Sequence, residues 1–294
     1  MEARHAYIKG LRGNGIFYRS EDFIVLITIV SVLVKKGGVK VMAFCPMFNH
    51  IHFLIKNISL YDLRRFIQRL AIIFVKEYNN EYGRKGTVFQ KPFGCSLKRT
   101  IKIIMGCVAY VFNNPVAAKL SRAAREYRWS LYAYHNNKNP YSEPLKKETC
   151  RNKMRVALKK VDYFHAKGQY LSYATLRDIF EYLNQKEHLQ MIDYILSKYY
   201  FLSKESLEEL YGSFSRMLIA VDSNAGAEFE LEDDYGDHSV YRKMLGTVMK
   251  YGYTDQKLNF ESLPRKEVGR LYKLLSERTR APRDSINRFL HCDF

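Results

Sequence analysis

Two neighbouring stretches, VKVMAFCP (39–46) and FNHIHFLIK (48–56), decide how the front of this chain folds. Both are short, apolar and rich in β-branched and aromatic side chains, which is typical of strands. A third stretch, HAYIKGL (5–11), has the same character and is followed by the turn-forming residues GNG. The sequence therefore predicts three strands near its beginning.

Helical patterns lie between and after these strands. SEDFIVLITIVSVLVKKGG (20–38) begins with Ser20, a favourable N-cap, and ends in lysines and glycines, which favours a buried helix. Its many β-branched residues would equally suit a strand. The stretch 59–83 is a clearer helix, because Ser59 can cap it and its apolar residues recur at helical spacing. TIKIIMGCVAYVFNNP (100–115) predicts a further helix that stops near its proline.

The order of these elements predicts the fold of a front domain, residues 1–135. The chain runs strand, helix, two strands, helix, a loop or short strand at 83–99, and a last helix. This order indicates an α+β fold, in which a ferredoxin-like antiparallel sheet carries helices on one face.

The remainder of the chain is predicted to be a linker and an all-helical C-terminal domain. Residues 136–153 are polar, contain two prolines and form the expected linker to residues 154–294. An acidic segment, 228–237, is an expected exposed loop. Residues 263–291 have the pattern of two helices joined by a short turn, with several arginines. They fit a helix-turn-helix-like DNA-binding unit or plain helical packing equally well.

The charge of the chain points to a polyanionic partner. Its formal net charge is +18 and its pI is near 9.6. Lys and Arg exceed Asp and Glu by 15 in residues 1–135, which leaves an excess of 3 for residues 136–294. Nucleic acid is the first expectation for such a surface, and an anionic membrane is the second.

Cysteine usage and hydropathy narrow the class of protein further. The five cysteines are odd in number, scattered and without a CxxC pair, which argues against a disulfide framework or a structural zinc site. The longest apolar run, residues 23–34, is too short to span a bilayer and follows SED rather than the basic residues of a signal peptide. We expect a cytoplasmic, nucleoid-associated protein without membrane contact, either a monomer or a homodimer.

The strand at 48–56 carries two histidines two residues apart. In a strand, Ile51, Phe53 and Ile55 share one side and face the core, which places His50 and His52 together on the other side. Two adjacent neutral imidazoles provide half of a divalent-metal site. A pair of surface or packing histidines is the simpler alternative.

The helix at 100–115 offers partners for this pair. Tyr110 and Asn114 are four residues apart and share a helical face. Tyr110 is a candidate nucleophile, and the side-chain oxygen of Asn114 is a candidate third ligand. Since residues before proline disfavour helical geometry, Asn114 is also a candidate for the end of the helix. Tyr110 is one of 23 tyrosines, so packing is its alternative role.

The combination of three motifs resembles the REP-associated tyrosine transposases, which belong to the HUH single-strand endonucleases. NHIHFL is followed about 60 residues later by YVFNNPVAAKL and then by YRWSLYAY. NEYGRKGTVFQKPFGCS (80–96) resembles the family segment ahead of the catalytic helix, so the likeness covers about residues 5–134. Phe48, Ala117 and Leu131 replace a proline, an arginine and a serine of the family pattern. None of these changes removes a catalytic group, although Ala117 bears on the efficiency of cleavage.

This resemblance implies the HUH nuclease fold for the front domain and a specific chemistry. It implies that His50, His52 and Asn114 bind Mg²⁺ or Mn²⁺ while Tyr110 attacks a phosphodiester. The implied activity is that of a metal-dependent endonuclease and strand transferase, which cleaves single-stranded DNA near a hairpin or repeat through a 5′-phosphotyrosine.

Six basic residues are predicted to line the path of the DNA backbone. They are Arg64, Arg65, Arg69, Lys91, Lys98 and Arg99. A solvated basic surface is the alternative for each. At the level of the whole protein, two other functions stay open: a non-cleaving DNA-repeat-binding or regulatory protein on the same fold and, from charge alone, an RNA-binding protein.

Overall fold

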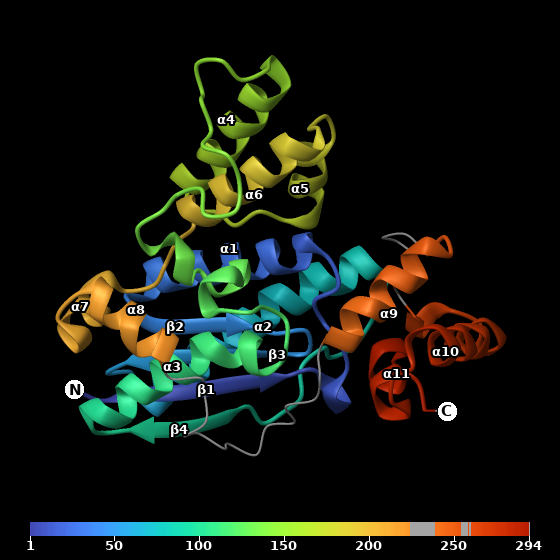
Figure 1. Ribbon diagram of the computed structural model, residues 1–294, viewed down its shortest axis with the longest axis horizontal. Helices are drawn as coiled ribbons and strands as arrows, with labels where there is room; N and C mark the ends of the chain where they lie inside the picture. Colours follow the sequence, from blue (N-terminus) through green and yellow to red (C-terminus); the bar gives the residue numbers. More distant parts are fainter. Residues whose placement is uncertain (224–238, 254–257, 259, 294) are drawn as a thin grey trace.

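A computed structural model of the protein describes residues 1–223, 239–253, 258 and 260–293. Its front part contains a four-stranded sheet of order β2-β3-β1-β4, and all neighbouring strands are antiparallel. The βαββαβ order of elements together with this strand order is the predicted ferredoxin-like arrangement (Figure 1). Its elements are β1 (Ala3–Lys9), α1 (Ser20–Gly37), β2 (Lys40–Pro46), β3 (His50–Lys56), α2 (Leu60–Tyr82) and β4 (Gly94–Lys98).

One face of the sheet packs against α1 and α2. Phe53 of β3 pairs with Ala6 of β1, and the Phe53 ring lies 5.7 Å from the ring of Phe66 in α2. Ile51 and Ile55 are fully buried on the same side. Because side chains alternate along a strand, these contacts confirm that residues 51, 53 and 55 face the helical core.

The stretch from residue 20 is a helix rather than a strand, and a carboxylate stabilises its beginning. Asp22 accepts hydrogen bonds from the backbone N–H groups of Tyr18 (2.8 Å) and Arg19 (2.9 Å). Its other oxygen accepts the hydroxyls of Tyr82 in α2 and Tyr173 in α5 (Tyr173–Phe180), each at 2.8 Å. Asp22, rather than the predicted Ser20, therefore anchors the backbone that leads into α1, at Tyr18 and at the N-cap Arg19, and also ties three helices together.

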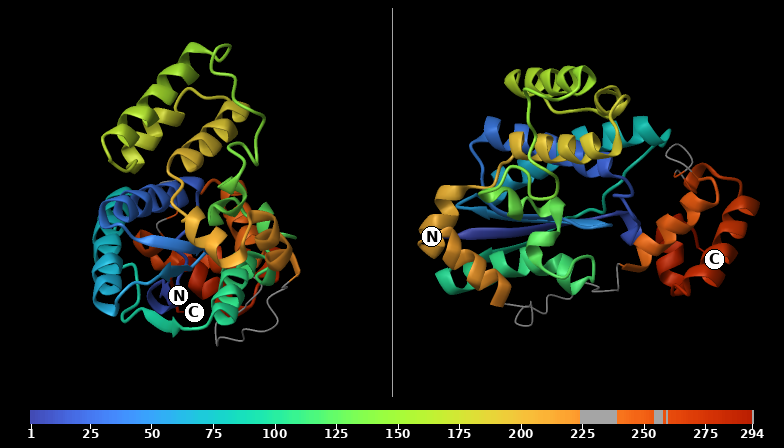
Figure 2. Two further views of the ribbon diagram at one scale, coloured as in Figure 1. Left: turned by 90° about the vertical axis from the view of Figure 1, so that its left-hand side faces the viewer. Right: turned by 45° about the horizontal axis from the view of Figure 1, so that its top comes forward.

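The other face of the sheet is covered by α3 (Ile101–Ala117), so helices lie on both faces rather than on one (Figure 2). Nearly every residue of β2 and β3 is buried, whichever way it points, and both faces therefore need a cover. The helix also continues to Ala117 instead of stopping near Pro115. This is tolerated because a proline near the end of a helix removes only one late backbone hydrogen bond.

The described part of the chain after residue 118 is helical and irregular, as predicted. Short 3-10 turns, η2 (Ala124–Glu126), η3 (Arg128–Ser130) and η4 (Tyr132–His135), precede the longer helices. The predicted helix over 203–222 is divided, because Gly212 adopts a left-handed conformation (φ 76°) that ends α7. The helices are α4 (Asn152–Ala166), α5, α6 (Gln185–Lys198), α7 (Lys204–Tyr211), α8 (Phe214–Ser223), α9 (Ser239–Lys250), α10 (Arg265–Thr279) and α11 (Arg283–Leu290).

These helices pack around the sheet in three groups. The helix α6 lies on α1, while α7 and α8 contact β2 and α3 (Figures 1 and 2). The third group, α9 to α11, lies at the end of the sheet where Phe48 stacks on Tyr241 of α9 at 4.1 Å. The division at residues 136–153 stays a prediction.

The helices α10 and α11 form the predicted helix, turn and helix, with Arg280 in the left-handed conformation between them. Their role in DNA binding stays a prediction. The acidic segment 228–237 lies outside the described residues. Among the residues that are described, no helix combines the length and apolar character needed to cross a bilayer.

Candidate active site

The two histidines of β3 lie side by side on the face of the sheet that α3 covers. Their ring centroids are 4.8 Å apart and their planes are nearly perpendicular, at 89°. His52 is fully buried, and His50 is 8% exposed. The strand alternation therefore produces the predicted pair of adjacent imidazoles, but beneath a helix rather than at the surface.

Tyr110 reaches this pair from α3. Its ring centroid lies 5.7 Å from that of His52 in an edge-to-face arrangement, and its side chain is 3% exposed. The helix that carries it is fixed at its beginning by the hydroxyl of Thr100, which accepts the N–H of Ile103 at 3.3 Å. Packing of α3 on the sheet thus brings together residues that are 58 positions apart in the sequence.

The two asparagines that follow Tyr110 have different surroundings. Asn113 donates its side-chain amide to the carbonyl of Val221 (2.7 Å), a contact that joins α3 to α8. Asn114 donates its Nδ2 to the carbonyl of Tyr110 (3.1 Å). Both side-chain amides thus donate to backbone carbonyls, and the role of the Asn114 oxygen as a metal ligand stays a prediction.

A third histidine, which the sequence analysis did not single out, completes the cluster. His5 of β1 is 1% exposed, and its Nε2 atom lies 3.0 Å from Nδ1 of His52. The two rings are stacked at 5.2 Å and 11°, and Tyr110 contacts the His5 ring edge-to-face at 5.7 Å. The alternation of the first strand, in which His5 and Tyr7 share a face, is the only sequence signal that points to it.

Hydrogen bonds determine which nitrogen of His50 carries its proton. The Asn49 side chain donates Nδ2 to the carbonyl of Gly13 (2.9 Å), so its Oδ1 atom faces His50 Nδ1 at 2.8 Å. An amide oxygen only accepts, and His50 Nδ1 must therefore donate. In the neutral ring the lone pair then lies on Nε2, the atom that a metal would bind.

Burial keeps the neighbouring ring neutral. Desolvation, followed by the nearby His50, His5 and Lys9, holds the pKa of His52 well below its usual value. The Nε2 atom of His52 is buried and has no hydrogen-bond partner among the described residues. A neutral imidazole with an unsatisfied buried nitrogen is the form that binds a divalent cation.

The donors fit a metal that keeps open coordination positions. No cluster of three or more His, Cys, Asp or Glu side chains with metal-site geometry occurs in the described part of the chain. The two imidazoles therefore supply at most two ligands, Asn114 stays the predicted third, and a metal here would keep positions for water or substrate oxygens. Such mixed nitrogen and oxygen ligands suit Mg²⁺ or Mn²⁺ rather than a closed structural site.

The structure does not bring all the predicted DNA-binding residues to this cluster. The α2 arginines (Arg64, Arg65 and Arg69) are exposed on a helix that lies across the sheet from His52. Lys91 lies with them, because it lines the same groove as Arg64.

Lys98 and Arg99 lie closer to α3. Lys98 ends β4 opposite Ala3, hence on the histidine side of the sheet, and its charge acts on Cys107 of α3. Arg99 pairs with Glu2 at 3.6 Å. These two basic residues therefore flank the beginning of the helix that carries Tyr110, whereas the other four lie on the opposite face.

Comparisons with known proteins relate the front part of the chain to a transposase family. Residues 16–114 match the family model described as "Transposase IS200 like". One solved structure, described as the REP associates tyrosine transposase bound to a REP hairpin, matches with 13% identity and a TM-score of 0.37. That match covers 51% of this chain and 88% of the other chain. No curated protein matches the chain. The family match confirms the predicted resemblance to tyrosine transposases for the front part of the chain.

Proposed function

Because residues 16–114 match the IS200-like transposase family, we propose that the protein is a metal-dependent endonuclease and strand transferase for single-stranded DNA near hairpins or repeats. The observation that carries the proposal is the position of Tyr110, whose ring lies 5.7 Å from that of His52. A phenol beside two imidazoles places a potential nucleophile next to groups that can bind a cation.

The proposed reaction exchanges one phosphodiester for another. The Tyr110 hydroxyl oxygen forms a bond to phosphorus, and the bond from phosphorus to the 3′ oxygen of the upstream strand breaks. The tyrosine proton leaves, and the released 3′ oxygen takes up a proton to become a hydroxyl. The 5′ end stays on Tyr110 as a phosphotyrosine, which a DNA 3′ hydroxyl can attack in the reverse sense.

The residues around Tyr110 prepare this step. Mg²⁺ or Mn²⁺ held by His50, His52 and Asn114 would withdraw charge from the phosphate and orient it. Asn49 holds the Nδ1 proton of His50, as the 2.8 Å contact requires. Burial of the cluster under α3 excludes water, which would otherwise compete with the 3′ hydroxyl for the phosphotyrosine.

One observation favours a second candidate function, a DNA-binding protein that does not cleave. Tyr110 is only 3% exposed, so a DNA strand reaches it only if neighbouring groups shift. The α2 arginines, which lie across the sheet, could meanwhile bind DNA with the cluster closed. The two functions differ in whether a covalent product forms.

A covalent-adduct assay separates the two functions. The full chain is incubated with labelled, hairpin-bearing single-stranded DNA and Mn²⁺, and the products are resolved in SDS. We expect an SDS-stable adduct with the wild type and none with Tyr110→Phe, which should still bind DNA.

Tyr163→Phe is the matched control, because Tyr163 is 57% exposed on α4, away from the cluster. It should form the adduct as the wild type does. Binding of hairpins with a range of flanking sequences, but no adduct with any of them, would favour the non-cleaving protein.

A further inference from the structure

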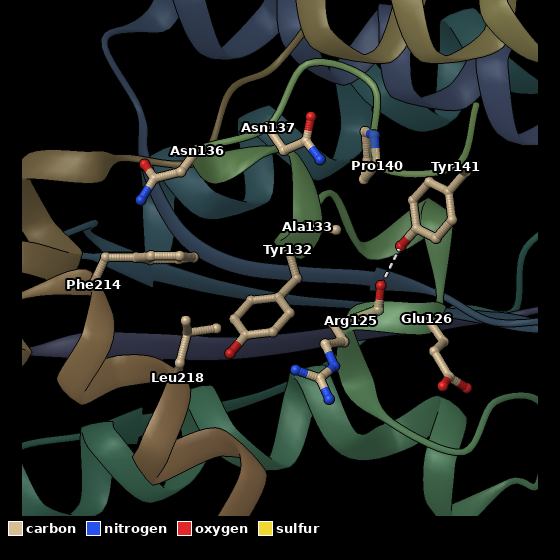
Figure 3. Close-up of a pocket in the computed structure, with 10 residues that line it drawn as sticks. All are labelled: Arg125, Glu126, Tyr132, Ala133, Asn136, Asn137, Pro140, Tyr141, Phe214 and Leu218. Atoms are coloured by element: carbon tan, nitrogen blue, oxygen red, sulfur yellow. Dashed lines mark hydrogen bonds between the residues drawn. The ribbon is translucent and has the colours of Figure 1, made fainter. Parts of the chain in front are cut away.

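A second site lies beside the catalytic helix, in a part of the chain that the family match does not include. It is a cavity of about 520 Å³, large enough for a nucleotide-sized ligand. Figure 3 shows side chains from η2, η4 and α8 that line it. They include Arg125, Tyr132, Asn136, Asn137, Phe214 and Leu218.

The apolar part of the lining is aromatic and held in place. The Phe214 ring is stacked on His135 with centroids 4.1 Å apart and planes 2° from parallel. Tyr132 lies next to it, with the ring centroids 6.3 Å apart. A ring supported from behind by another ring is a rigid surface on which a planar ligand can stack without ordering further side chains.

The polar part of the lining has the groups that recognise a base and a phosphate. Asn136 is exposed and makes no hydrogen bond to a described residue, while Asn137 uses only its oxygen, which accepts the N–H of Asn139 at 2.9 Å. The Arg125 guanidinium pairs with no described carboxylate. Glu126, the acidic residue in the lining, is engaged by the backbone N–H of Arg122 at 3.0 Å.

One buried hydroxyl beside the cavity has no described partner. Tyr132 is 1% exposed, and its Oη atom makes no hydrogen bond to any residue that the structure describes. A buried polar atom without a partner is energetically unfavourable, so such atoms mark places where a ligand or water binds. Burial raises the pKa of Tyr132, which keeps its proton available for donation.

The cavity is connected to the nucleophile through α3. Tyr132 packs on Phe112 with ring centroids 4.7 Å apart, and Phe112 is two residues beyond Tyr110 on the same helix. Since residues two apart point to nearly opposite sides of a helix, the cavity and the histidine cluster lie on opposite sides of α3. They are thus separated by about one helix diameter, roughly 10–12 Å.

We propose that this cavity binds one unpaired nucleobase of the DNA strand whose phosphate reaches Tyr110. The base stacks on Phe214, its edge meets the amides of Asn136 and Asn137 and the Tyr132 hydroxyl, and Arg125 contacts the adjoining phosphate. The proposal rests on the proposed function for its ligand, single-stranded DNA, but not on cleavage. Base stacking on an aromatic ring and amide contacts to base edges are the usual means by which proteins hold unpaired nucleotides.

The test uses the full chain with Tyr110→Phe, in buffer with chelator, so that neither cleavage nor metal affects the result. Unstructured oligonucleotides that carry 2-aminopurine at successive positions report stacking by loss of fluorescence. We expect quenching at one position, lost with Phe214→Ala. We expect Asn136→Ala and Tyr132→Phe each to weaken oligonucleotide binding about three- to tenfold.

Controls keep the outcome decisive. Asn136 is exposed, so Asn136→Ala should fold normally even if Phe214→Ala does not. Asn152→Ala, an exposed asparagine of α4 outside the cavity, should bind as the parent does. Equal binding by Asn136→Ala and its parent together with unchanged quenching in Tyr132→Phe would overturn the proposal. So would tighter binding of deoxynucleoside monophosphates than of oligonucleotides, which would indicate a free-nucleotide site.

The two proposals can fail separately. Adduct formation by wild type with no effect of the cavity variants on binding would remove the base site and leave the endonuclease. Position-specific quenching without any adduct would remove the endonuclease and leave the base site.

Discussion

Replacing His5 should weaken metal binding although His5 is not a proposed ligand. Its Nε2 atom lies 3.0 Å from Nδ1 of His52, and both rings are buried. For His52 Nε2 to carry the lone pair that binds a cation, Nδ1 must carry the proton, and His5 must accept it. We therefore regard His5 as a positioning residue for His52, in the role that Asn49 has for His50.

The expected magnitude follows from the loss of one buried hydrogen bond. In His5→Leu the Nδ1–H group of His52 has no acceptor. The ring is then more stable when it turns over or when its proton moves to Nε2, the nitrogen that would bind the metal. A buried hydrogen bond contributes about 1–1.5 kcal/mol, or roughly tenfold in a dissociation constant. Replacing a residue that hydrogen-bonds to a metal-binding histidine typically weakens metal affinity by about 10–100-fold. We expect Mn²⁺ binding to weaken about tenfold or more.

Calorimetric titration of Mn²⁺ into the folded chain measures this effect directly. His5→Gln keeps an acceptor oxygen and should retain most of the affinity that His5→Leu loses. His165→Gln, on α4 and away from the sheet, should titrate as the wild type does. Wild-type affinity in a folded His5→Leu protein, or equal losses in the Leu and Gln variants, would refute the reasoning.

Two further predictions concern stability and DNA binding. Asp22→Asn should lower the free energy of unfolding by about 2–4 kcal/mol, because the amide cannot accept from the Tyr82 and Tyr173 hydroxyls and from two backbone N–H groups at once. A urea midpoint equal to that of wild type would contradict this. Changing the three α2 arginines together to Gln should reduce the slope of log K against log salt by about 2, if each contacts one phosphate of single-stranded DNA. An unchanged slope in fluorescence titrations would show that the α2 arginines do not contact the strand.

Local patterns predicted the elements well where one physical cause dominated. The helix α2 begins where predicted, with Ser59 accepting the N–H of Asp62 at 3.0 Å. The strands β2 and β3 also lie where their apolar runs placed them. Prediction was weaker where two causes compete, as at Pro115, which lies inside α3, and at Ser20, where Asp22 provides the capping interaction. The conformational preference of a single residue does not show which of two neighbouring groups will cap or end a helix.

The sequence by itself determined the strand order along the chain, the shared face of His50 and His52, and the basic front half, because alternation and charge are local properties. Only the tertiary structure decided which groups meet that face. Register pairs Tyr7 with His52 and so brings His5 to the cluster, and packing of α3 on that side adds Tyr110. The tertiary structure also places the α2 arginines on the face of the sheet opposite to the histidine cluster. Strand pairing and helix packing bring together residues that are tens of positions apart in the sequence. The pattern within one segment does not specify which other segment will pack against it.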